Sequence, residues 1–212
     1  MTMTTETARC KEILSCDDKD IVVKELEAKY PGAMAHVKAI LGLIGDNPER
    51  EGLKDTPYRV VKSWLELYSG YEEDEKKLNT FFEESIGDTD EIVICKDITF
   101  YSTCEHHMIT FNGLVHIGYL PGKRVIGVSK LVRLVNLFAR RLQIQEKLCS
   151  QIADKLMEIL EPQGVGVIIE AQHLCMTARG VRNPTSKMIT SAMRGKFKLQ
   201  PQTRNEFLTL IK

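Results

Sequence analysis

Residues 91–122 read EIVICKDITFYSTCEHHMITFNGLVHIGYLPG, and this stretch decides the fold class. Its β-branched and aromatic residues predict strands at 92–101, 108–111 and 114–120. Asn112-Gly113 is the strongest short hairpin signal, so we expect the chain to reverse there. Pro121-Gly122 predicts the next turn. The centre of the protein is therefore expected to be an antiparallel sheet.

Helical patterns lie on both sides of this stretch. Apolar spacing predicts helices at 20–30, 34–44, 55–68, 129–141, 143–160 and 201–211, and further strands at 165–171 and 187–197. Residues 1–18 carry no period and are expected to form a mobile leader. Acidic residues 71–90 are expected to form a linker with a short helical piece. This order predicts an α+β fold.

Composition narrows the class of protein. The chain has 212 residues, of which 43% are hydrophobic and 27% charged, as is typical of one large folded domain with an appended segment. No apolar run is long enough to span a bilayer, and the N-terminus lacks a signal-peptide pattern. Six cysteines without a CxxC pair indicate reduced thiols and a cytoplasmic protein.

The net charge of zero hides an asymmetry. Residues 1–95 hold 12 basic and 21 acidic side chains, and residues 96–212 hold 17 and 8. The basic portion suits a phosphorylated ligand, or it pairs with the acidic portion in the fold or in an oligomer.

Two short segments concentrate metal-ligand chemistry. Cys104 and His107 are spaced as C-x-x-H, with His106 between them, and His173 and Cys175 are two residues apart. On an extended strand, residues at i and i+2 point to the same side. Five candidate ligands in two segments predict a Zn²⁺ site.

The ligand count leaves two alternatives open. Four protein ligands would make a closed, purely structural site, whereas three leave a position for water. In either case at least one histidine is spare, and a spare histidine beside a metal is a natural general acid or base. We interpret His36 and His116, which lie outside the cluster, as structural.

Several side chains could bind a substrate. Ser129, Lys130 and Arg133 open a predicted helix, which suits a phosphate, although by itself the pattern favours a solvated basic face. Further cations could join them from elsewhere in the chain: Arg59, Lys62 and Arg179. The Glu146 carboxylate, beside Gln145, could accept two N–H bonds from a guanine edge, or it could form a surface ion pair.

Four motifs together carry a family resemblance: STCEHH (102–107), GVSKLVR (127–133), QIQEK (143–147) and HLCMTARG (173–180). From about Asp46 onward the chain resembles GTP cyclohydrolase I. The resemblance implies the tunnelling fold, an antiparallel sheet with helices packed on one face and an N-terminal helical extension. It also implies a toroidal homodecamer of two pentamers with active sites at subunit interfaces. Residues 1–45 are then the leader and extension, and 46–212 the catalytic domain.

The implied reaction converts GTP and water to 7,8-dihydroneopterin triphosphate and formate, the first step of folate or tetrahydrobiopterin biosynthesis. By resemblance, Cys104, His107 and Cys175 are the zinc ligands. His106 assists proton transfer at the purine ring. His173 is the acid or base in the later ribose rearrangement, with Ser129 nearby.

The substrate contacts follow from the same resemblance. Gln145 and Glu146 match the pair that holds guanine. The matches to the triphosphate contacts are Lys130, Arg133 and Arg179, together with Arg59 and Lys62 from a neighbouring subunit. This sequence departs little from the motifs of the family: Val128 and Lys147 replace the more usual Leu and Arg. Residues 201–211 resemble animal-type members, which suggests a regulatory protein partner and allosteric control.

Two other classes of protein share part of this pattern. A zinc nucleobase deaminase would also use His/Cys/Cys ligation, but its H-x-E and P-C-x-x-C signature is absent from this sequence. A structural zinc module or a pterin-binding assembly protein would merely pack its histidines. The sequence has no Walker-type loop, and we expect neither a nucleic-acid nor a membrane partner.

Overall fold

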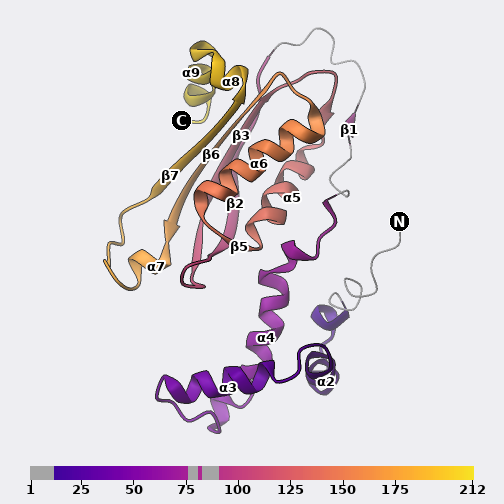
Figure 1. Ribbon diagram of the computed structural model, residues 1–212, viewed down its shortest axis with the longest axis vertical. Coiled ribbons are helices and arrows are strands. Elements are labelled where there is room, and N and C mark those ends of the chain that lie inside the picture. Colours follow the sequence, from indigo (N-terminus) through magenta and orange to yellow (C-terminus); the bar gives the residue numbers. More distant parts are fainter. Residues whose placement is uncertain (1–11, 76–80, 83–90) are drawn as a thin grey trace. The chain divides into compact units, whose positions relative to one another are not determined.

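The computed structural model describes residues 12–75, 81–82 and 91–212 (Figure 1). The chain divides into two compact units, Met1–Glu73 and Asp74–Lys212. The two units are described separately below. Among the described residues, no helix combines the length and apolar character needed to cross a membrane.

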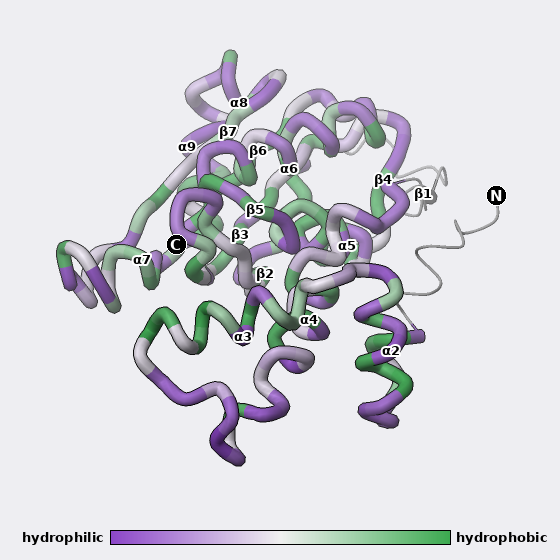
Figure 2. The backbone as a smooth tube through the Cα atoms, turned by 60° about the horizontal axis from the view of Figure 1, so that its bottom comes forward, coloured by the Kyte–Doolittle hydropathy of each residue, from purple (hydrophilic) through white to green (hydrophobic). Residues whose placement is uncertain are grey.

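The first unit is helical, as the sequence predicts. Its elements are α2 (Lys19–Lys29), α3 (Ala33–Leu43), the short η1 (Glu51–Leu53), α4 (Thr56–Leu67) and η2 (Ser69–Tyr71). Asp18 caps α2 by accepting hydrogen bonds from the backbone N–H groups of Asp20 and Ile21. Hydrophilic and hydrophobic residues alternate along α2 (Figure 2). The predicted helices and their boundaries are thus confirmed to within two residues.

The expectation of a mobile leader is wrong for its last residues. Ile13 is only 3% exposed and packs in one apolar cluster with Val22 and Leu26 of α2 and with Val61 of α4. Residues 1–11 lie outside the described part of the chain. The sequence did not predict this contact, because the apolar pair Ile13-Leu14 is too short to show a helical period. The burial of Ile13 nevertheless packs this part of the segment against the helices.

The second unit is built on a five-stranded sheet in the order β5-β2-β3-β6-β7. Its strands are β2 (Val93–Cys104), β3 (Thr110–Leu120), β5 (Leu142–Gln143), β6 (Gly164–His173) and β7 (Met188–Gly195). All pairs are antiparallel except β2 with the short β5. A separate two-stranded sheet joins β1 (Phe81–Phe82) to β4 (Val125–Ile126). The α+β class with an antiparallel sheet is confirmed.

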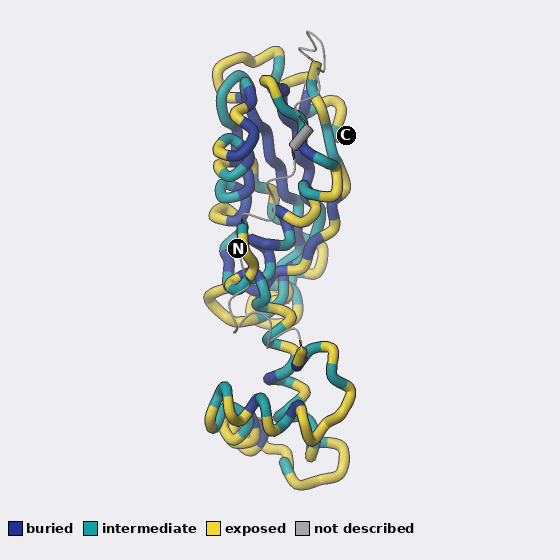
Figure 3. The backbone as a smooth tube through the Cα atoms, turned by 90° about the vertical axis from the view of Figure 1, so that its right-hand side faces the viewer, coloured by how far each residue is buried: buried dark blue, intermediate teal, exposed yellow. Residues whose placement is uncertain are grey.

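Helices cover both faces of this sheet rather than one. α5 (Val128–Ala139) and α6 (Gln145–Leu160) share the main core with alternate residues of β6 such as Val167 and Ile169. Ile168 points the other way and packs with Phe197 and Phe207 of the C-terminal helices α8 (Lys196–Leu199) and α9 (Pro201–Leu210). In Figure 3, helices α5 and α6 lie on one side of the buried strands, and the C-terminal end of the chain lies on the other.

The predicted strand 187–197 and the one-face arrangement differ from the structure at the C-terminal end of β7, whereas the predicted helix 201–211 is confirmed by α9. Phe197 was expected in a strand, but it lies in α8, where its ring is completely buried. A Cβ on Gly166 would come within 2.6 Å of this ring. The glycine therefore makes room for a helix on the second face, which strand periodicity does not reveal.

The predicted hairpin turn is wrong. Asn112 and Gly113 lie inside β3, where they pair with Tyr101 and Phe100. Gly113 is needed for a different reason: a Cβ there would lie 1.9 Å from the carbonyl oxygen of Glu170 on β6. The real reversal between β2 and β3 occurs at residues 105–109, within the predicted metal motif.

Candidate active site

A tight turn at the end of β2 brings the first candidate ligands together. The Cys104 N–H donates to Ile109 O over 2.9 Å, and the Met108 N–H donates to Cys104 O over 2.8 Å. Cys104 Sγ lies 3.9 Å from Nδ1 of His107 and 3.8 Å from Nδ1 of His106. The two imidazole rings are 6.3 Å apart and inclined by 76°, so adjacent histidines face different directions.

The second segment reaches this turn through the pairing of β3 with β6. Phe111 pairs with His173, the last residue of β6, and α7 (Leu174–Thr177) follows at once. Cys175 therefore lies in a helical turn and not, as expected, on an extended strand with His173. Candidate ligand atoms of Cys104, His107 and Cys175 all lie within 4.8 Å of one another, whereas His173 is turned elsewhere.

This cluster fits a zinc ion by its donor chemistry. Two sulfurs and one imidazole are ligands that Zn²⁺ prefers, and ligand atoms around tetrahedral zinc are roughly 3.3–3.8 Å apart. Cys104 is buried, Cys175 is half-buried and His107 is exposed, so one side of the cluster is open. Burial, and then the neighbouring Cys104 thiol, raise the pKa of Cys175, while the Arg179 cation acts in the opposite direction.

His173 is held by a different set of contacts. Its Nε2 lies 2.9 Å from Oε1 of Gln145, and its ring stacks on Phe111 with the centroids 4.6 Å apart and an interplanar angle of 2°. Burial lowers the pKa of His173, and the nearby Glu146 carboxylate partly offsets this effect. Glu146 is exposed, while Gln145 is buried. Phe111 was not predicted from the sequence as a site residue, because only the strand register places it there.

The predicted phosphate-binding residues on α5 lie away from the cluster in the same chain. α5 ends at Ala139, and β5 follows at once and pairs with Thr103 and Cys104. The C-terminal end of α5 is therefore near the cluster of Cys104, His107 and Cys175. Ser129 is exposed and lies in the first turn, about 15 Å of helix rise from Ala139, whereas the exposed Arg133 lies near the middle of the helix. Lys130, in the same first turn, is half-buried.

The remaining predicted cations are divided between the units. Arg179 is exposed and lies just beyond α7, four residues after Cys175. Arg59 and Lys62 belong to α4 in the first unit. There the Arg59 guanidinium lies 3.5 Å from an Asp55 oxygen, and Lys62 Nζ donates a 2.8 Å hydrogen bond to Cys16 O.

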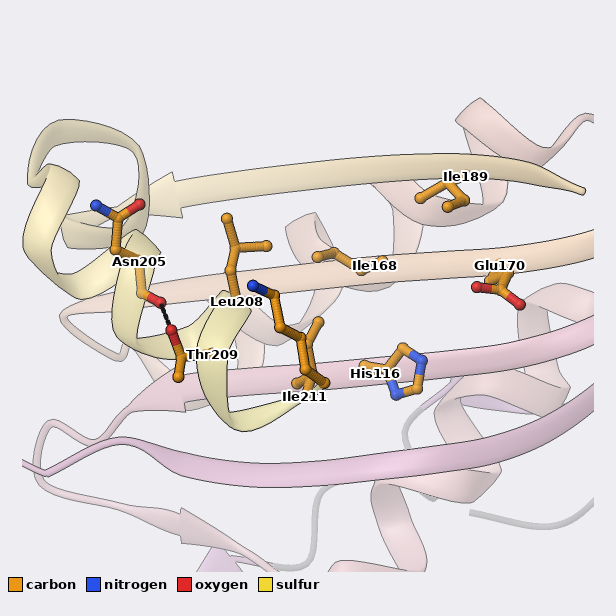
Figure 4. A pocket seen from close by; sticks show the side chains of 9 residues that line it. His116, Ile168, Glu170, Ile189, Asn205, Leu208, Thr209 and Ile211 are labelled. Atoms are coloured by element: carbon orange, nitrogen blue, oxygen red, sulfur yellow. Dashed lines mark hydrogen bonds between the residues drawn. The ribbon is translucent and has the colours of Figure 1, made fainter.

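A separate pocket of about 550 Å³ lies between the sheet and α9 (Figure 4). Its lining includes His116, Glu170 and Ile211 but none of the predicted site residues. Nδ1 of His116 accepts a 3.2 Å hydrogen bond from the Asp97 N–H. This bond supports an irregularity of β2 at which Asp97 has a φ of 62°, in agreement with the structural role expected for His116.

The fold and the cluster together define an α+β protein with a Cys-His-Cys candidate metal centre beside two further histidines. Residues 33–212 match the family model described as GTP cyclohydrolase I. The chain belongs to the GTP cyclohydrolase I family.

Curated relatives agree with this assignment. GTP cyclohydrolase 1 of Wolinella succinogenes is 52% identical over 197 residues, which are 92% of this chain and 99% of that protein. GTP cyclohydrolase 1 of Mycobacterium tuberculosis (strain H37Rv) is 52% identical over 84% of this chain and 89% of its own length. Among solved structures, the archaeosine synthase QueF-Like in the apo form aligns with a TM-score of 0.41 at 17% identity, over 49% of this chain and 93% of that one.

Proposed function

We propose that this protein converts GTP and water to 7,8-dihydroneopterin triphosphate and formate with Zn²⁺ held by Cys104, His107 and Cys175. The observation that carries the proposal is the convergence of these three side chains, from segments about 70 residues apart, in a chain of the GTP cyclohydrolase I family. The product would feed folate or tetrahydrobiopterin biosynthesis.

Different residues of the chain are assigned to different steps of the reaction. An open three-ligand zinc site supplies Lewis-acid activation of water when the ion is bound. His106 lies beside the cluster but outside the ligand trio, which supports assigning its imidazole to proton transfer at the purine ring while C8 is hydrolysed. His173 is assigned the proton transfers of the later ribose rearrangement, assisted by Ser129.

Substrate binding is assigned to exposed charges. The Glu146 carboxylate near His173 can accept two N–H bonds from the guanine edge. Arg179 is the triphosphate cation at the cluster end of the sheet. Lys130 lies in the first turn of α5 and Arg133 near its middle, away from the end that adjoins the cluster, so in our proposal they serve the cluster of a second copy. Arg59 and Lys62 join them from a neighbouring subunit.

This division of the binding residues supports an oligomer in which each site is shared. We propose the homodecamer of two pentamers, in a toroidal tunnelling-fold assembly, located in the cytoplasm. A regulatory protein partner is proposed on the likeness of residues 201–211 to animal-type members. The catalytic domain is proposed to span 46–212, preceded by the leader and helical extension.

The first experiment incubates the purified protein with GTP and follows formate release and pterin absorbance. We expect both products in equal amounts, lost with a chelator and restored by added zinc. His106→Ala should retain zinc but release no formate, whereas Cys175→Ser should lose both metal and turnover. Bound zinc with intact GTP would contradict the proposal and favour a scaffold role for the cluster.

A mixing experiment tests the shared site. His106→Ala and Arg133→Ala are each expected to be inactive, because each removes one part of every site. Co-expression of the two variants should restore about a quarter of the wild-type activity, since random assembly then unites two intact parts in one site of four. If the co-expressed pair stays inactive while forming mixed oligomers, the two parts act within one chain.

A further inference from the structure

Gln145 and Glu146 are adjacent in sequence but have opposite surroundings. Glu146 is exposed, whereas Gln145 is 1% exposed and its side chain runs inward to β6 and β7. Gln145 Nε2 lies 3.0 Å from the carbonyl oxygens of both Ile169 and Met188, and 3.2 Å from Oγ1 of Thr190. The amide nitrogen is therefore surrounded by acceptors.

These acceptors determine which way the amide faces. A carbonyl oxygen accepts hydrogen bonds but never donates one, so the NH₂ group of Gln145 must face Ile169 and Met188. A flipped amide would set its oxygen against both carbonyl oxygens, which repel it and cannot donate a hydrogen bond to it. The sheet backbone thus fixes Gln145 Oε1 on the side of His173.

The fixed oxygen in turn determines the state of His173. Nε2 of His173 lies 2.9 Å from Oε1, so it must carry the hydrogen and donate it. The parallel Phe111 ring holds the plane of the imidazole. We infer that Gln145 is a positioning residue that holds His173 in one orientation and as the Nε2–H tautomer, which leaves the Nδ1 lone pair to accept a proton.

This inference rests on the proposed function and separates two residues that the sequence treats as a pair. Glu146 contacts the guanine, whereas Gln145 acts through His173. During the rearrangement, His173 takes a proton from a substrate hydroxyl at Nδ1 and later returns it to the substrate, so no net proton is consumed. The bond from Nε2–H to Gln145 persists throughout and stabilises the transient imidazolium.

The test compares the ratio of pterin formed to formate released in three variants: His173→Ala, Gln145→Met and Gln143→Met. Gln143→Met is the matched control, because Gln143 is equally buried and its amide nitrogen bonds instead to Phe138 O and Gln151 Oε1. A merely structural loss lowers both products together and leaves the ratio at one.

We expect Gln145→Met to slow pterin formation about 10- to 100-fold. The ratio should fall below one, as in His173→Ala, without a rise in KM for GTP. Should Gln145→Met fail to fold, Gln145→Asn takes its place, because it keeps an amide that is one methylene too short to span both contacts.

Other outcomes overturn the inference in distinguishable ways. A ratio of one with a raised KM would make Gln145 a guanine contact. Kinetics like those of Gln143→Met would leave it a packing residue. A ratio of one in His173→Ala would reject the role proposed for His173 and the inference with it, whereas a wild type that leaves GTP intact would reject the proposed function itself.

Discussion

Gly113→Ala tests the close approach of β3 to β6. The added Cβ would lie 1.9 Å from the Glu170 carbonyl oxygen, 2.7 Å from Ala171 Cα and 2.9 Å from Glu170 C. All three atoms belong to the backbone, so no side-chain rotation relieves the contact. Carbon atoms pack at about 3.5–4.0 Å, so the strands must part by more than 1 Å at this point. We expect a loss of about 3 kcal/mol or more in the free energy of unfolding.

The assay is denaturant unfolding at one fixed protein concentration, because the stability of an oligomer depends on concentration. Gly42→Ala is the matched control: Gly42 lies within α3 with nothing within 4 Å of its added Cβ. It should stabilise the protein by about 0.5–1 kcal/mol. A loss of only about 1–2 kcal/mol in Gly113→Ala is what a left-handed turn glycine would give, and it would refute the strand placement.

Three further predictions concern single side chains. Ile13→Ala should cost about 2–4 kcal/mol of stability, because Ile13 is buried; no measurable change would restore the mobile leader. Burial raises the pKa of Cys149 from 9.0 to about 11. The unfolded thiol therefore loses its proton first, so stability should fall by about 2 kcal/mol between pH 9 and pH 11 in wild type relative to Cys149→Ala, and parallel curves would contradict this. Glu146→Ala should raise KM for GTP at least tenfold with unchanged thermal unfolding, since Glu146 is exposed; a normal KM would remove it from the guanine site.

The longer helices could be predicted from the sequence because their packing is local and periodic, whereas the four-residue helices α7 and α8 are too short to show a period. In α6, Leu148, Ile152 and Leu156 recur at helical spacing, and all three are fully buried. The predicted turn at Asn112-Gly113 is wrong because the same dipeptide suits two different structures. One is a left-handed turn, and the other is a strand position where two backbones approach closely. Only the pairing of β3 with β6, which joins residues far apart in sequence, distinguishes them.

The metal site could be predicted in part from residue chemistry, because few residue types bind zinc and five candidates stand in two short segments. The choice of Cys104, His107 and Cys175 among the five came from the family resemblance, and the structure brings these three together. The surroundings of the trio could not be predicted, because they depend on tertiary geometry. Nothing in the dipeptide Gln145-Glu146 shows that one side chain points into the sheet and the other outward.

The end of the β3–β6 pair organises the candidate site as one mechanical unit. Gly113 lets the two strands approach, and this approach aligns Phe111 with His173 two residues further along. The chain that leaves His173 carries Cys175 to the turn at Cys104, so the same alignment also completes the metal trio. A displacement of β6 would therefore disturb His173 and the candidate metal ligands together. The link between strand approach and site geometry explains why position 113 needs a glycine, although this residue has no chemical function of its own.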